Sequence, residues 1–115
     1  MNVIEKNQGK KIDYAVVGTT IVFDDDLSIN CAKRQSDNPV HEDICYDERG
    51  MLVVGAAAGR RYVAEIDIPK REYIYHEPVS VHGDEADGAE MMESEPPTPV
   101  PLNMDNVTLT LWAIE

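Results

Sequence analysis

The sequence predicts an all-β domain, an antiparallel small sandwich or barrel of about seven or eight strands. Three observations point to this fold class. Short segments rich in β-branched and aromatic residues recur along the chain, and several of them alternate apolar with polar side chains. Glycine, proline, asparagine or aspartate separates these segments, as in turns between antiparallel strands. No apolar repeat with the helical period persists over more than about ten residues.

Four strands are expected in the N-terminal part of the chain. Residues 1–9 are short and polar, and we expect them to be frayed. Apolar alternation in residues 12–16 predicts the first strand, and the β-branched run at 20–23 predicts the second. Three consecutive aspartates, Asp24 to Asp26, predict a polar hairpin turn rather than a calcium loop, because the spaced ligands of such a loop are absent. Residues 27–31 and 40–46 are the third and fourth expected strands.

The central segment, residues 51–77, is expected to supply three more strands, at 51–54, 62–68 and 73–75. The small residues between Gly55 and Gly59 predict a hairpin loop. Pro69 has no N–H to donate to a ladder, so we expect the strand before it to end there. The alternation in 62–68 predicts that one face of this strand carries Tyr62, Ala64, Ile66 and Ile68.

Residues 83–101 differ in composition from the rest of the chain. They hold six acidic residues, four prolines and no basic residue. Such a segment buries too little apolar surface to offset the entropy of ordering it, so we expect a flexible acidic, proline-rich loop. Apolar alternation then resumes at 107–114 and predicts a last strand inside the sheet. The whole chain, residues 1–115, is expected to form a single domain.

The charge balance limits the partners of the chain. Ten basic residues face twenty-two acidic residues, a net charge of −12, which argues against free nucleic acid or an anionic membrane surface as partner. No apolar run reaches membrane length, and the first eleven residues lack the apolar core of a signal peptide. Two cysteines, Cys31 and Cys45, form no disulfide framework. We therefore expect a cytoplasmic protein.

Arg60 and Arg61 are the candidate ligand-binding residues. They follow the small-residue loop, whose backbone N–H groups and two guanidinium groups would suit an anion such as a nucleotide or metabolite. The loop lacks the Lys-Ser/Thr pair of a phosphate-binding loop, so an ordinary hairpin loop is the competing interpretation.

Metal and cofactor binding are not expected from the spacing of the residues. His41, His76, His82 and the two cysteines are metal-capable, but no two of them have the sequence spacing of a ligand pair. No nucleophile motif selects a catalytic residue, so we expect no enzymatic activity. The candidate interface residues are aromatic residues and one arginine, types that are enriched in interface cores: Tyr62, Arg71, Tyr73, Tyr75 and Trp112.

The run from Arg60 to Pro69, with the ending from Val107 to Trp112, resembles small acidic β-rich proteins of unknown function from gut bacteria, of phage or prophage type. The resemblance covers about half the chain, carries no catalytic motif and implies no site residue. It implies an accessory or structural role. The leading expectation is therefore a non-enzymatic binding or assembly module that binds a protein partner or associates with itself. The alternatives are an anionic-ligand binder that uses the Gly55–Arg61 loop, and an acidic inhibitor of a basic protein.

Overall fold

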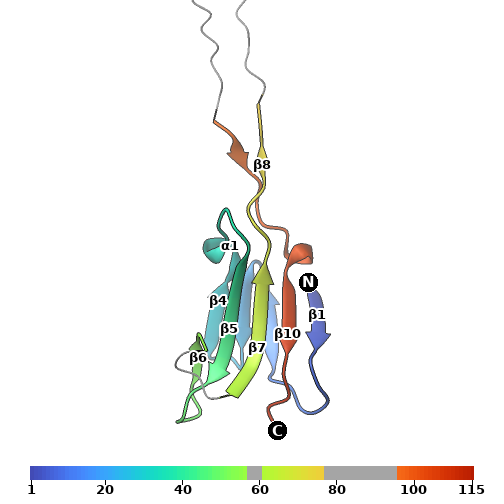
Figure 1. Cartoon of the computed structure of the whole chain (residues 1–115), viewed down its shortest axis with the longest axis vertical. Helices are drawn as coiled ribbons and strands as arrows, with labels where there is room; N and C mark the ends of the chain where they lie inside the picture. Colours follow the sequence, from blue (N-terminus) through green and yellow to red (C-terminus); the bar gives the residue numbers. More distant parts are fainter. Residues whose placement is uncertain (57–60, 77–95) are drawn as a thin grey trace, which may run out of the picture.

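The computed structural model describes residues 1–56, 61–76 and 96–115, and it consists mainly of β-strands. A five-stranded sheet with the order β1-β10-β7-β5-β6 packs in front of a three-stranded sheet with the order β2-β3-β4 (Figure 1). A two-stranded ribbon, β8-β9, extends from one end of the two layers. The predicted all-β fold class is confirmed, with open sheets and no closed barrel among the described residues.

The described residues form ten strands, more than the seven or eight expected. The large sheet contains β1 (Asn2–Glu5), β10 (Thr108–Leu111), β7 (Arg61–Ile68), β5 (Val40–Tyr46) and β6 (Leu52–Val54). The small sheet contains β2 (Tyr14–Val17), β3 (Thr20–Phe23) and β4 (Leu27–Asn30), and the ribbon pairs β8 (Tyr73–Ile74) with β9 (Thr98–Pro99). Two short helices, α1 (Cys31–Arg34) and η2 (Met104–Asn106), complete the described elements.

The turns of the small sheet follow from their residues. Gly18 has φ +62° in the two-residue connection between β2 and β3, a conformation that glycine adopts without a Cβ penalty. Asp24 and Asp25 have φ +53° and +51°, and Asp26 N–H donates to Phe23 C=O at 2.9 Å. Asp tolerates this left-handed conformation better than most residues. The predicted hairpin turn at the three aspartates is therefore confirmed.

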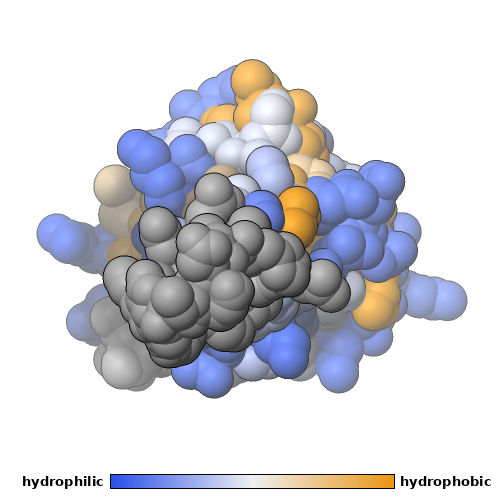
Figure 2. All heavy atoms as spheres, turned by 90° about the horizontal axis from the view of Figure 1, so that it is seen from above, coloured by the Kyte–Doolittle hydropathy of each residue, from blue (hydrophilic) through white to orange (hydrophobic). Residues whose placement is uncertain are grey.

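The core lies between the two sheets. Strand β3 contributes Ile21 and Phe23, which are fully buried, and the large sheet contributes Ile66 and Leu109 from adjacent strands. Each large side chain of this kind stabilises the fold by roughly 1.5–3 kcal/mol on burial. Seen from the end that carries the ribbon, the surface is mostly hydrophilic, with a few hydrophobic patches (Figure 2).

The N-terminal residues form a strand, so the expectation that they fray is wrong. Strand β1 pairs in parallel with β10, the last strand of the chain. Asn2 N–H donates to Val107 C=O at 2.9 Å, and Lys6 N–H donates to Leu111 C=O at 2.8 Å. The polar composition of residues 1–9 gave no sign of this strand, because its pairing partner lies about a hundred residues away.

A β-bulge in β7 changes the expected faces of the strand. Ile44 pairs with Ala64 while Cys45 pairs with Tyr62, so Val63 is the extra residue on β7. Val63 is fully buried, whereas Tyr62 is 39% exposed. The prediction that Tyr62 shares the face of Ala64 is therefore wrong, because the bulge shifts the alternation by one residue.

Two other expected boundaries differ from the structure. Residue 31 begins α1 instead of extending the third strand, because the Asn30 side chain accepts a hydrogen bond from Lys33 N–H at 3.2 Å and caps the turn. The last strand ends at Leu111, short of the predicted residue 114. Residues 83–95 of the expected acidic loop lie outside the described residues, and β9 falls within the described remainder, residues 96–101.

Candidate functional site

A group of polar side chains lies on the outer face of the large sheet, opposite the core. In the antiparallel pairing of β5 with β7, His41 is opposite Asp67 and Asp43 is opposite Glu65. Directly paired residues of antiparallel strands project from the same face, and residues two apart on one strand share that face. The register therefore gathers one imidazole and three carboxylates from two strands.

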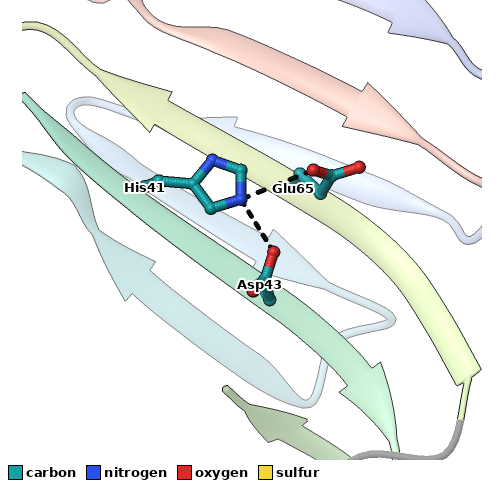
Figure 3. A group of neighbouring side chains, drawn as sticks. All are labelled: His41, Asp43 and Glu65. Carbon is teal, nitrogen blue, oxygen red and sulfur yellow. Dashed lines mark hydrogen bonds and ion pairs between the residues drawn. The ribbon is translucent and has the colours of Figure 1, made fainter. Parts of the chain in front are cut away.

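His41 is the centre of this group (Figure 3). Its Nδ1 lies 2.6 Å from Asp67 Oδ1, and its Nε2 lies 2.8 Å from Asp43 Oδ1 and 3.4 Å from Glu65 Oε1. The hydrogen bond with Asp67 raises the pKa of His41 above its usual value; partial desolvation opposes this effect, and Asp43 adds to it. The carboxylates thus favour a positive charge at this point of the sheet.

An aromatic pair borders the same group. The Trp112 indole Nε1–H donates to Glu65 Oε2 at 2.6 Å, and the Trp112 ring stacks on Tyr62 with 5.3 Å between ring centroids. Lys6 Nζ lies 5.6 Å from the centroid of the Trp112 ring, within the range of a cation–π contact. These contacts hold one oxygen of Glu65 and leave the other, Oε1, directed toward His41 (Figure 3).

This geometry could hold a cation. One atom from each of His41, Asp43 and Glu65 lies within 4.8 Å of the other two. The expectation of no metal site considered only ligand spacing along the chain. Sequence spacing does not show which residues of two different strands lie side by side in a sheet. The signal in the sequence is the alternation of His41 with Asp43 in one strand and of Glu65 with Asp67 in another, but only the register shows that they meet.

The two candidate ligand-binding arginines are only partly described. Arg60 belongs to residues 57–60, which lie outside the described residues. Arg61 begins β7, and its guanidinium carbon lies 5.7 Å from the centroid of the Tyr46 ring. The anion-binding site at this loop therefore stays a prediction.

The candidate interface residues fall into two separate groups. Tyr62 and Trp112 stack on the outer face of the large sheet, whereas Arg71, Tyr73 and Tyr75 lie at the ribbon. The Arg71 side chain donates to Gln35 C=O at 2.8 Å, and the Tyr73 hydroxyl donates to Asp37 Oδ1 at 2.5 Å. Arg71 and Tyr73 thus attach the base of the ribbon to the loop after α1. An interface role for either group stays a prediction.

The free edge of β2 was not among the predicted sites. All four of its residues, Tyr14–Val17, are exposed, although none of them is charged. Among the strands that the structure describes, β2 pairs with β3 alone. An alternating apolar segment predicts a strand, but the position of that strand at an edge depends on the sheet order, which the sequence does not give.

Comparison of the chain with family models, curated proteins and solved structures found no match. The described helices are both too short to cross a lipid bilayer.

Proposed function

We propose that this chain is a non-enzymatic binding and assembly module that associates with a second copy of itself through the free edge of β2. The observation that carries the proposal is an exposed, uncharged edge strand in a strongly acidic chain. Exposed strand edges offer unpaired N–H and C=O groups, and they are natural sites for the addition of another strand.

The hydrogen bonds of the β2–β3 hairpin identify the groups that face outward. Asp24 N–H donates to Asp13 C=O at 2.8 Å, so Asp13 bonds toward β3. Hydrogen-bonded and non-bonded positions alternate along an antiparallel strand. Ala15 and Val17 therefore also bond toward β3, and the backbone groups of Tyr14 and Val16 point to the free edge.

In residues 1–56, 61–76 and 96–115, nothing gives the edge of β2 the usual protection against strand addition. Proline, lysine, bulges or very short strands normally block such edges. At the outer edges of the large sheet, β6 has only three residues, and β1 ends at Glu5, which pairs with Lys11 at 3.4 Å. Strand β2 has four uncharged residues, with Val17 68% exposed and Val16 42% exposed.

A second copy fits this edge better than an unrelated chain of the same charge. Two molecules that each carry a net charge of −12 repel each other over most of their surfaces. The electrostatic repulsion between them is smallest where an uncharged strand of one copy meets the same strand of the other. An antiparallel pairing centred on Ala15 is two-fold symmetric. It places Tyr14 opposite Val16 of the second copy, with both side chains on the core side, because they share that side with Phe23 and Ile21. The two small sheets would then form one continuous sheet.

Two further parts of the proposal rest on the resemblance and on the cysteines. The resemblance to small acidic β-rich proteins of unknown function of phage or prophage type, which implies an accessory or structural role, supports assembly rather than catalysis. A cytoplasmic location is supported by the two unpaired and buried cysteines, since reducing compartments keep thiols free.

The test is the concentration dependence of the molar mass, measured by sedimentation velocity or light scattering. We expect the wild-type chain to reach twice the monomer mass, and Val16→Lys to stay monomeric, because the dimer would bury the added charge against Tyr14 of the second copy. Met51→Lys is the matched control, since Met51 is an exposed apolar residue (55%) in the turn before β6 and receives the same charge. A wild-type chain that is monomeric at all concentrations, or a Val16→Lys variant that still dimerises, overturns the proposal.

A further inference from the structure

The outer face of the large sheet carries three potential metal ligands of the right chemical types. His41 offers Nε2, Asp43 offers Oδ1 and Glu65 offers Oε1. The Nε2–Oε1 distance of 3.4 Å matches the separation of about 3.3 Å between ligand atoms that each lie 2.0–2.1 Å from a tetrahedral ion. The Nε2–Oδ1 distance of 2.8 Å is shorter, so Asp43 would rotate slightly away from the ring as an ion entered.

The remaining polar atoms of two of these ligands are already occupied by orienting partners. Asp67 Oδ1 lies 2.6 Å from His41 Nδ1, where it accepts a hydrogen bond, so an ion bound at Nε2 would replace the proton that Nε2 shares with Asp43 Oδ1 at 2.8 Å. Trp112 donates to Glu65 Oε2 at 2.6 Å and leaves Oε1 on the side of His41, 3.4 Å from Nε2. A carboxylate on the second nitrogen of a ligating histidine is the usual outer partner at protein metal sites.

The charge of the group also favours a divalent ion. Asp43, Glu65 and Asp67 bring three carboxylates around one imidazole on adjacent strands. A doubly charged cation would balance the two carboxylates that ligate it, while the third would bond to neutral His41. The His41 side chain is 46% exposed, so an ion and its water ligands could enter from solvent.

We propose that His41, Asp43 and Glu65 bind one divalent transition-metal ion of the zinc class, with Asp67 and Trp112 as outer-shell partners. An imidazole ligand disfavours calcium and magnesium, which prefer all-oxygen sites, and suits zinc. The site is independent of self-association, because β2 belongs to the other sheet.

The experiment is calorimetric titration of zinc chloride into the chelator-treated full chain, together with its thermal denaturation with and without zinc. We expect one ion per chain and a zinc-dependent rise of the melting temperature. His41→Gln should abolish both effects. Asp67→Asn should weaken zinc binding by about 10–100-fold, because it removes the carboxylate that orients His41 and leaves the three ligands in place.

His76→Gln is the matched control. His76 is the other described histidine, and its Nε2 bonds to Thr98 Oγ1 at 2.8 Å in the ribbon. This variant should bind zinc as the wild type does, and circular dichroism without zinc should show that both histidine variants are folded. The proposal is overturned if the wild type binds no zinc, if His41→Gln binds it equally well, or if the binding is lost in His76→Gln.

Discussion

Replacing Leu109 with alanine tests whether β10 holds the core of the sandwich together. Leu109 is fully buried, and it lies in register between Ile66 of β7 and Val3 of β1. Removing most of a buried leucine side chain costs about 2–5 kcal/mol, the higher values applying where the cavity does not collapse. Because β10 is paired on both sides, we expect little collapse and a loss of about 3 kcal/mol. That loss is a large part of the roughly 5–15 kcal/mol by which a domain is stable.

The assay is urea denaturation followed by far-ultraviolet circular dichroism. With a slope of about 1–3 kcal/mol per molar urea, the midpoint should fall by about 1–3 M for Leu109→Ala while the slope stays the same. Thr110→Ala is the control on the same strand, because Thr110 faces outward between Glu65 and Ile4 and should cost less than about 1 kcal/mol. A loss for Leu109→Ala no greater than that for Thr110→Ala would refute a central role for β10.

Two other predictions concern loops. Gly9→Ala should destabilise the chain more than Gly50→Ala in the same urea assay. Both glycines have a positive φ, which alanine adopts only with strain. The two sites differ in space, because a Cβ added at Gly9 would lie 2.8 Å from Ala113 Cβ, whereas a Cβ added at Gly50 would meet no atom within 4 Å. Asp47→Ala should destabilise the chain at pH 7, because hydrogen bonds led by that from Met51 N–H (2.9 Å) hold the pKa of Asp47 below its usual 3.8. A lowered pKa stabilises the fold above the unfolded-state pKa, so the destabilisation of the variant should shrink as the pH falls through the lowered pKa, where protonation removes the charge from Asp47. Equal losses for the two glycine variants, or a difference for Asp47→Ala that is as large in strong acid as at pH 7, would contradict these assignments.

Local patterns predicted much of the fold. The β-branched run at residues 20–23 and the segment at 40–46 have the predicted boundaries, because their pattern and flanking turns are determined by neighbouring residues. Strand β1 and the bulge at Val63 escaped prediction for a shared reason: both depend on which distant strand lies alongside. The pairing of strands that are far apart in the sequence does not change the local pattern of apolar and polar residues, so that pattern cannot reveal it.

The candidate site on the outer face shows the same limit. His41, Asp43, Glu65 and Asp67 all belong to two strands that the sequence predicts. Their spacing along the chain did not indicate that His41 lies beside Glu65. The interface role predicted for Trp112 stays a prediction, and the contact of its ring with Glu65 on the outer face was not foreseen. The register between β5 and β7 would have been needed to see the first relation, and the pairing of β10 with β7 would have been needed to see the second.

Amide hydrogen exchange along β2, measured by nuclear magnetic resonance at low and high protein concentration, tests self-association most directly. Ala15 and Val17 bond within the hairpin, so their amides should be protected at every concentration. Tyr14 and Val16 amides point to the free edge, so they should exchange quickly in dilute solution and become protected as the molar mass doubles. If Tyr14 and Val16 exchange at the same rate at both concentrations, the edge of β2 is not where this chain assembles.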